Sequence, residues 1–213
     1  MAGFRTSHLA PLAALALAAS LPAAGAVPAA AATTTYTITG LGSLGAGGTN
    51  GSAVNATGQV TGYSSLSALV QDPAGCPPNY PNPKKCVEHP WHAFLYGNGQ
   101  MTDLGTLGPP GTWSFTQAVA INNNGQIAGT VFSGGTTEGF LYNNGTITNL
   151  GSFLAAAIND NGVMVGGDQI DTGGTLQNLN TLLPAGSPTI QDATAINNNG
   201  QIVASPAVLL NPS

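Results

Sequence analysis

The eight-residue string AINNNGQI occurs twice in this chain, at residues 120–127 and again at residues 195–202. Two relaxed copies, AVNATGQV at residues 53–60 and AINDNGVM at residues 157–164, follow the same pattern. Each copy has a glycine at its sixth position, and the last three of these glycines are spaced by 37 and 38 residues. Because self-similarity at such a period is the signature of a repeat fold, the chain is predicted to contain about four copies of one supersecondary unit.

Each copy has the properties of a short antiparallel hairpin. Asn and Gly tolerate the positive φ of tight turns, so NNNGQ is expected to reverse the chain, as are GNGQ at residues 97–100 and NNGT at residues 143–146. The flanking segments FLY, TIT, AVAIN and QIAGTV are short and rich in β-branched or aromatic residues, and TYTITGL at residues 35–41 alternates like a strand. No long segment shows a 3.6-residue period, so an all-β fold is predicted.

Four strands per unit and a period near 40 residues favour a β-propeller of about four blades, covering residues 33–213. If FLY is the first strand of a unit, the chain ends with AVLL at residues 207–210, where FLY would recur. This C-terminal strand is then expected to complete the first blade and close the ring. In the segment GGDQIDTGG at residues 166–174 the FLY signal is largely lost, which leaves one strand undecided. A β-trefoil and an open β-solenoid remain as alternatives.

A family resemblance rests on two adjacent runs, HAFLYGNGQMTDLGTLG at residues 92–108 and AVAINNNGQIAG at residues 118–129. Their combination resembles the extracellular HAF-type repeat, which is named after its His-Ala-Phe, and the resemblance covers most of residues 35–213. It implies a secreted bacterial repeat protein and supplies no catalytic residues. The His-Ala-Phe is intact only once, and the next copy reads Glu-Gly-Phe at residues 138–140.

Residues 1–32 have the pattern of a signal peptide. Arg5 gives a short basic start, an alanine- and leucine-rich stretch follows, and small-x-small sites end at Ala26 and at Ala32. The sequence therefore predicts export, with cleavage near one of these two alanines. The alternative is a membrane anchor, but the stretch is interrupted by prolines and shorter than the about 20 strongly apolar residues that a span needs.

An insert at residues 64–90 separates the first two copies of the unit. It contains Cys76 and Cys86, the two cysteines of the chain, with Tyr80 between them in a proline-rich loop. In an exported protein two cysteines so close together are expected to pair, so a Cys76–Cys86 disulfide is predicted. A redox role is the alternative, but the CxxC spacing is missing.

Charged residues make up only 5% of the chain, against roughly 25% in typical soluble domains. Three basic residues oppose eight acidic ones, so the surface must be neutral and rich in amides and hydroxyls. Nucleic acids and anionic membranes are bound mainly by Lys and Arg. Neither is therefore expected as a partner of the mature protein.

Glu88, His89 and His92 are the strongest candidates for metal ligands, because carboxylate and imidazole groups hold zinc or copper. Pro90 prevents a helix that would align them, and His92 belongs to the repeat, so a structural role is favoured and no metal or cofactor is predicted. The NDNG turn at residues 159–162 resembles the start of a calcium loop but lacks the distal acidic ligand. The sequence leaves calcium binding at this turn undecided.

Catalytic motifs are largely missing, since GxSxG, HExxH and a phosphate-binding glycine loop do not occur. A pair of carboxylates is enough to hydrolyse a glycan. The acidic residues available for this are Asp103, Glu138, Asp160, Asp168, Asp171 and Asp192. Asp103 and Asp160 occupy repeat positions that hold Asn in other copies, which favours roles in turns and strand ends, so no catalytic residue is assigned.

Both tryptophans fall on connections that are predicted to share one face. In a meander of four strands the short first-to-second and third-to-fourth turns lie on one side, and the other connections lie on the opposite side. Trp91, Trp113, Tyr80 and the loop 76–86 are therefore expected to form a partner-binding surface, because exposed aromatic residues on loops are typical of binding sites. The alternative is that the tryptophans only pack the insert against a blade.

The predicted function is that of a secreted, non-enzymatic binding or structural module of the cell exterior. It would engage a polysaccharide or a protein through loops on one face. An extracellular glycan hydrolase with paired carboxylates is the alternative class, and a simple packing scaffold is the third.

Overall fold

A computed structural model describes residues 34–45, 47–67, 70–71, 87–88, 90–107, 114–133 and 135–212 of the chain. The chain divides into two compact units, Met1–Ile38 and Thr39–Ser213, and the second contains every strand of the described residues. The predicted signal peptide, with its cleavage sites, lies outside the described residues. Within the ranges just given, no helix is long and apolar enough to span a bilayer.

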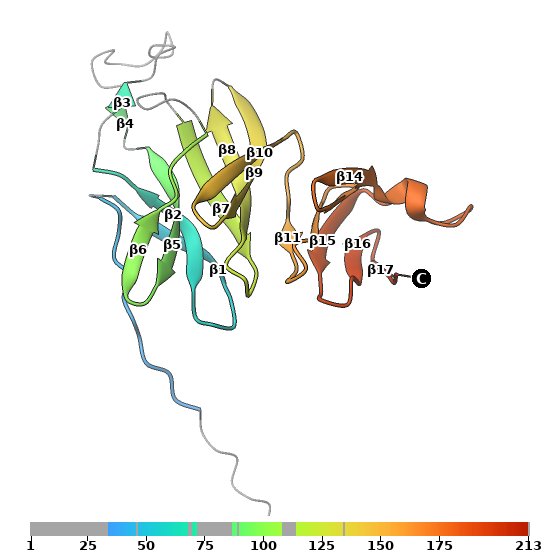
Figure 1. Cartoon of the computed structure of the whole chain (residues 1–213), viewed down its shortest axis with the longest axis horizontal. Helices are drawn as coiled ribbons and strands as arrows, with labels where there is room; N and C mark the ends of the chain where they lie inside the picture. The colour runs from blue at the N-terminus through green and yellow to red at the C-terminus, as the bar shows by residue number, and fades with distance from the viewer. Residues whose placement is uncertain are drawn as a thin grey trace, which may run out of the picture. The chain divides into compact units, whose positions relative to one another are not determined.

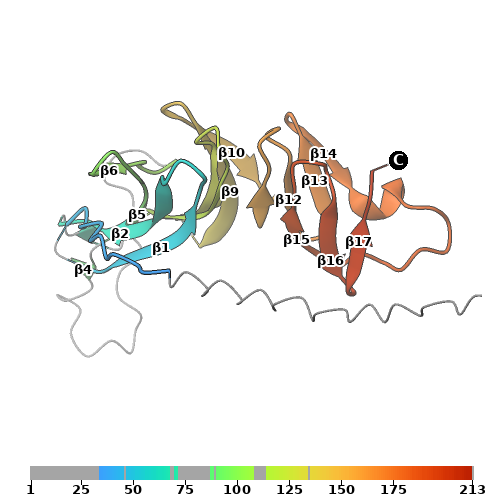
Figure 2. The same ribbon diagram turned by 90° about the horizontal axis from the view of Figure 1, so that it is seen from below.

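Thr39–Ser213 folds into four successive antiparallel sheets arranged as the blades of a β-propeller, which confirms the predicted fold (Figure 1, Figure 2). Within a blade, each strand pairs with the next one in the chain. The first blade contains β1 (Thr49–Val54), β2 (Val60–Ser65), β5 (Trp91–Gly97) and β6 (Gln100–Asp103). The second blade contains β7 (Ser114–Ile121), β8 (Ile127–Ser133), β9 (Thr136–Asn143) and β10 (Thr146–Gly151).

The third and fourth blades are built from shorter strands. The third contains β11 (Ala157–Ile158), β12 (Met164–Gly166), β13 (Gln169–Thr172) and β14 (Thr175–Asn178), followed by the 3-10 helix η2 (Leu179–Leu182). The fourth contains β15 (Asp192–Ile196), β16 (Ile202–Ser205) and β17 (Val208–Leu210). The GGDQIDTGG segment forms β13, so the strand that the sequence left undecided is present.

The repeated string forms a hairpin in every blade, as predicted, and this hairpin is the first of its blade. In the second blade Ile121 at the end of β7 pairs with Ile127 at the start of β8, and the turn between them contains Gly125 with a φ of 76°. GNGQ connects β5 to β6, and NNGT connects β9 to β10, which confirms both of these turns as well.

The order of strands within a blade differs from the prediction. The AVAIN-type strand comes first, and FLY is the third strand of the blade instead of the first. The C-terminal AVLL segment accordingly forms β17, which pairs with β16 as the third strand of the fourth blade. It does not complete the first blade, because that blade takes all four of its strands from residues 49–103.

The strand predicted at residues 35–41 does not form. Tyr36 and Ile38 are 90% and 100% exposed, so the alternating pattern buries nothing. A strand of this kind would need a FLY strand as its neighbour. The first FLY strand, β5, already pairs on both edges, with β2 and with β6. The FLY equivalent of the fourth blade, β17, pairs on one edge only, with β16, and its other edge takes no strand among the described residues.

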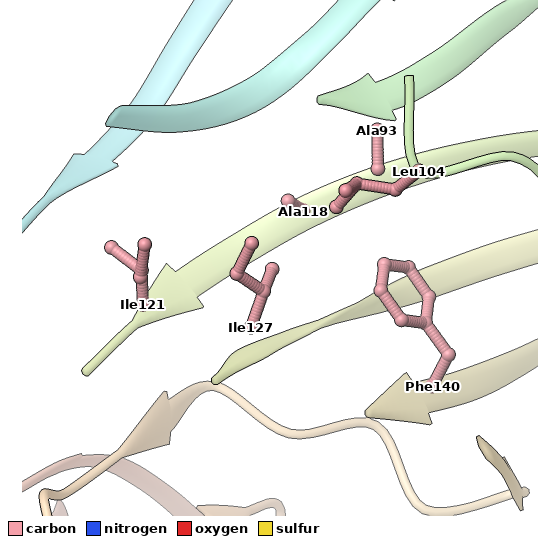
Figure 3. Close-up of a cluster of buried hydrophobic side chains, with 6 residues drawn as sticks. All are labelled: Ala93, Leu104, Ala118, Ile121, Ile127 and Phe140. Atoms are coloured by element: carbon pink, nitrogen blue, oxygen red, sulfur yellow. The ribbon is translucent and has the colours of Figure 1, made fainter. Parts of the chain in front are cut away.

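Apolar clusters lie at three successive junctions between blades, and their side chains are at most 9% exposed. The junction of the first and second blades contains Ala93, Leu104, Ala118, Ile121, Ile127 and Phe140 (Figure 3). The junction of the second and third contains Ala128, Phe153, Ala155, Ile158 and Met164. The junction of the third and fourth contains Val165, Leu179, Ile190, Ala193, Ile202 and Ala204. Since burying one large apolar side chain is worth about 1.5 to 3 kcal/mol, these clusters hold the blades together in sequence.

The glycine in the second strand of the repeat is required by close packing. A Cβ on Gly129 of β8 would collide with the carbonyl oxygen of Gln117 and would lie 2.6 Å from the ring of Phe140. Gly62 and Gly166 occupy the same position in the first and third blades, and each faces a backbone carbonyl just as closely. The glycine of the QIAG and QVTG patterns is therefore required because the backbone of the neighbouring strand lies too close for a side chain.

The insert at residues 64–90 connects β2 to β5. Its base is a two-stranded ribbon in which β3 (Val70–Gln71) pairs with β4 (Val87–Glu88). The predicted disulfide partners Cys76 and Cys86 lie outside the described residues.

Candidate functional site

The first hairpin turns of the four blades form one set, which we call the turn array: residues 55–59, 122–126, 159–163 and 197–201. The first residue of each turn is an asparagine whose Oδ1 accepts the backbone N–H groups two and four positions later. Asn122, for example, accepts from Asn124 at 3.0 Å and from Gln126 at 2.9 Å. An Asn side chain at this position therefore closes the turn on its own backbone.

The same asparagines also connect one blade to the next. Asn55 Nδ2 donates to the carbonyl oxygen of Asn122 at 3.0 Å. Asn122 Nδ2 donates to Asn159 at 2.9 Å, and Asn159 Nδ2 donates to Asn197 at 3.0 Å. One side chain thus fixes its own turn and the position of the following turn.

A second series of hydrogen bonds runs beside the first, through the second residue of each turn. The backbone N–H of Ala56 donates to Asn123 Oδ1 at 2.8 Å. The N–H of Asn123 donates to Asp160 Oδ1 at 2.8 Å, and the N–H of Asp160 donates to Asn198 Oδ1 at 2.9 Å. We call the two series together the asparagine ladder. It crosses all three junctions that the apolar clusters fill.

Asp160 is the one acidic side chain in the ladder. Its carboxylate accepts the backbone N–H of Asn123, and it also accepts the side-chain amides of Asn123 at 2.8 Å and of Asn198 at 2.7 Å. The backbone hydrogen bond from Asn123 and then the side-chain bonds hold the pKa of Asp160 below its ordinary value. The NDNG turn therefore uses its carboxylate inside the ladder. In the described residues, no group of three His, Cys, Asp or Glu side chains is placed to hold a metal ion.

The four turns surround a common hollow with a volume of about 420 Å³. Each turn contributes three consecutive residues to its wall: 54–56, 121–123, 158–160 and 196–198. In Figure 1 the turns between β1 and β2 and between β15 and β16 lie along the same side of the blades. Six asparagines line it together with apolar residues of each turn, and Asp160 is the one charged side chain of the wall.

His92, the histidine of the His-Ala-Phe motif, is paired across the third and fourth strands. Its Nδ1 lies 2.8 Å and 3.0 Å from the two carboxylate oxygens of Asp103, so the ring must carry its proton on Nδ1 to donate to an ionised carboxylate. Burial raises the pKa of Asp103, but the hydrogen bonds from His92 and from the backbone N–H of Gly105 outweigh it and leave the pKa below its ordinary value.

The same cross-strand pair recurs in the next two blades with other residues. Asn149 Nδ2 donates to Glu138 at 2.8 Å, and Asn178 Nδ2 donates to Asp168 at 2.6 Å. In all three blades the residue on the fourth strand also accepts a backbone N–H two positions later. His92 therefore occupies a structural position of the repeat, and its predicted neighbour His89 lies outside the described residues.

Four aromatic side chains from the first two blades form a second surface, which we call the aromatic row: Tyr63, Trp91, Phe115 and Phe132. Trp91 stacks on Phe115 with ring centroids 4.4 Å apart, and its centroid is 6.2 Å from that of Tyr63. Phe115 is buried, whereas Trp91 and Phe132 are 38% and 37% exposed. Trp91 pairs with Ser65 at the end of β2, while the asparagine turn lies at its other end, before Val60.

Of the predicted binding residues, the structure describes only Trp91, at the start of β5. Tyr80, Trp113 and the whole loop 76–86, with both cysteines, lie outside the described residues, so their clustering with Trp91 stays a prediction. Sequence reasoning missed the asparagine ladder. A signal was present, because Asn stands first in all four turns although an Asn-Gly pair alone would reverse the chain.

No family model matches the chain, and no match was found among curated proteins or solved structures. The resemblance to the HAF-type repeat therefore stays a prediction. The repetition itself does not depend on it, since the turn array and the cross-strand pairs recur in successive blades of the structure.

Replacing Asn122 by Ala should destabilise the protein strongly. The side chain is 3% exposed, and its loss leaves two backbone N–H groups of its own turn without their partner. It also removes one of the two donors to the carbonyl of Asn159, which keeps only the N–H of Gly162. We expect the free energy of unfolding to fall by about 3 kcal/mol in urea denaturation. Asn124→Ala is the matched control, because this exposed side chain makes one hydrogen bond, to the carbonyl of Asp160. Equal losses in the two variants would contradict the role assigned to Asn122.

Replacing Asp160 by Asn should lower the melting temperature at neutral pH, because an amide N–H would then face the donors of Asn123 and Asn198. A carboxylate with a depressed folded pKa stabilises fully above its ordinary pKa and loses this contribution as the pH falls through the folded value. The difference in melting temperature from wild type should therefore be largest at pH 5 to 7 and shrink below about pH 4.

The matched control for this pH series is Asp192→Asn. Asp192 is exposed, and its carboxylate makes no hydrogen bond within the described part of the chain. Thermal melts from pH 2 to 7 by circular dichroism would compare the two variants. A melting-temperature difference for Asp160→Asn that does not change with pH would refute the assignment.

Proposed function

We propose that this chain is an exported, non-enzymatic module that binds an uncharged polysaccharide through the aromatic row. The observation that carries the proposal is the position of Trp91. It lies on a strand of a rigid sheet, its ring is held by a 4.4 Å stack on the buried Phe115, and it is 38% exposed. A large aromatic ring that is fixed in place and open to solvent presents an apolar surface at little entropic cost on binding.

Sugar rings suit this surface because the C–H faces of a pyranose are apolar while its edge bears hydroxyls. Phe132, which is also partly exposed, lies beyond Phe115, with its ring centroid 6.5 Å from that of Phe115. The exposed rings thus belong to two neighbouring blades, β5 of the first and β8 of the second. A chain of sugar residues can use both, whereas a single small ligand needs only one.

The charge of the chain supports a neutral ligand. Only 5% of residues are charged, and the three basic residues of the sequence are Arg5, Lys84 and Lys85. Acidic polysaccharides, like nucleic acids, are recognised mainly by Lys and Arg, which the blades do not supply. Amide and hydroxyl groups, which dominate here, suit an uncharged partner.

The acidic side chains support binding over hydrolysis. Five of the six candidates accept hydrogen bonds that belong to the fold: Asp103, Glu138, Asp160, Asp168 and Asp171. A glycosidase needs two carboxylates that are free to donate a proton to the glycan and to attack it or activate water. Carboxylates that hold turns and strand ends are poorly suited to this. Export, and the Cys76–Cys86 disulfide that would stiffen the insert beside Trp91, belong to the same proposal.

Replacing Trp91 by Ala should abolish retention on an insoluble uncharged polysaccharide. The protein would be recovered from the culture medium and mixed with cellulose, chitin, xylan or starch granules, and the bound fraction measured. We expect wild type to be retained on at least one of them and Trp91→Ala to lose about 90% of that retention, since an aromatic contact is worth about 0.5 to 1.5 kcal/mol beyond the area it buries and about 1.4 kcal/mol is a factor of ten in affinity. The melting temperature of Trp91→Ala shows whether the lost retention results only from unfolding of the variant.

Tyr36→Ala is the matched control, because Tyr36 is an aromatic residue 90% exposed outside the blades. It should bind like wild type. Retention of wild type on none of the polysaccharides, or equal retention of folded Trp91→Ala, would refute the proposed ligand. Failure to find the protein in the medium would refute its export.

A further inference from the structure

The asparagine ladder has two unlike ends. In the fourth turn Asn197 Nδ2 donates to Gln201 of its own turn and, among the described residues, to no following turn. The backbone N–H of Asn198 likewise has no acceptor there, although the equivalent N–H groups of Asn123 and Asp160 each have one. This end of the ladder therefore presents hydrogen-bond donors.

The first turn presents acceptors. The carbonyl oxygen of Asn55 accepts the N–H of Gly58, as in every turn. In the part of the chain that the structure describes, it receives no second donor, whereas the carbonyls of Asn122, Asn159 and Asn197 each receive one from a preceding turn. Position 56 is also unlike the others. It holds an alanine where the other three turns have an Asn or Asp oxygen, so no side chain here can accept the N–H of Asn198.

Both ends of the ladder line the same hollow. Its wall includes residues 54–56 of the first turn and residues 196–198 of the fourth, and its volume is about 420 Å³. Small-molecule sites have volumes of about 300 to 1,000 Å³, so the space suits one or two sugar rings. No hydrogen bond joins the fourth turn to the first within the described residues, although all three other pairs of neighbouring turns are bonded.

The chemistry of the ends selects a class of ligand. A hydroxyl group both donates and accepts, so neighbouring hydroxyls can accept from Asn197 and Asn198 and donate to Asn55. Asp160, the one charged group of the wall, disfavours an anion, and its oxygens already accept hydrogen bonds from Asn123 and Asn198. A cation needs acceptor atoms, whereas the fourth turn offers N–H donors. A neutral ligand with several hydroxyls satisfies both ends.

We propose that this hollow is a second sugar-binding site, in which an uncharged sugar residue bridges the fourth turn to the first. The site is distinct from the aromatic row, which lies at the other end of β2. The polar groups at both ends are fixed before the ligand arrives, because Asn55 and Asn197 each hold two backbone N–H groups of their own turns. Such preorganisation lowers the entropic cost of binding a flexible sugar.

The test is an NMR titration of isotopically labelled protein with cellohexaose, maltohexaose, xylohexaose and chitohexaose, each to about 10 mM, which covers millimolar affinities. We expect at least one sugar to shift the side-chain amide of Asn197 and the backbone amide of Asn198. Shifts at the indole N–H of Trp91 report the aromatic row separately. Signals that move only at Trp91 would support the proposed function and overturn the second site. Signals that move only at Asn197 and Asn198 would support the second site and overturn the proposed function.

Ala56→Asn is the decisive variant, since it puts into the first turn the side chain that two of the other turns have. The new amide should occupy the hollow and supply the missing acceptor, so the affinity read from Asn197 should fall about tenfold or more. Ala185→Asn makes the same change on an exposed loop between η2 and β15 and should leave the affinity unchanged. Unchanged affinity in folded Ala56→Asn would overturn the proposal, and Ala56→Ser serves the same purpose if the asparagine prevents folding. Absence of any shift at Asn197 and Asn198 in wild type would overturn it as well.

Discussion

The carboxamide of the first asparagine in each hairpin turn is the interaction on which the arrangement of the blades depends. Its oxygen closes the turn by accepting two backbone N–H groups, and at Asn55, Asn122 and Asn159 its nitrogen bonds the carbonyl of the next turn. A planar group with donors on one side and an acceptor on the other can serve both purposes at once. This explains why AINNNGQI recurs letter for letter: the string encodes a turn and also the contact between two successive blades.

The ladder works together with apolar packing. Each of the three junctions that it crosses is also filled by a cluster of buried side chains, such as the one around Phe140 (Figure 3). Apolar packing supplies most of the free energy but has little directional preference, whereas the hydrogen bonds fix the distance and rotation of one blade against the next. With so few charged residues, ion pairs contribute little here. The one described salt bridge, between His92 and Asp103, lies within a single blade.

Local features of the fold could be predicted from the sequence, and long-range ones could not. Asn-Gly turns and alternating strands are visible within ten residues, so the hairpins and the four-blade propeller were foreseen. Which strand begins a blade depends on pairing between distant segments, and the FLY strand was therefore misplaced, along with the partner of β17. The second bond of Asn122, 37 residues away to Asn159, exists only once the blades are packed. Of the predicted site, Trp91 is described, but its expected partners lie in segments that the structure does not describe.

Amide hydrogen exchange at the second residue of each turn tests the ladder most directly. The backbone N–H groups of Asn123 and Asn198 are chemically equivalent and both residues are exposed, but only that of Asn123 has an acceptor in the following turn. The ladder predicts that the Asn123 amide exchanges at least about 100-fold more slowly than that of Asn198, because it opens only when the blades separate. Equally fast exchange at the two amides would contradict the claim that hydrogen bonds between turns hold the blades in place.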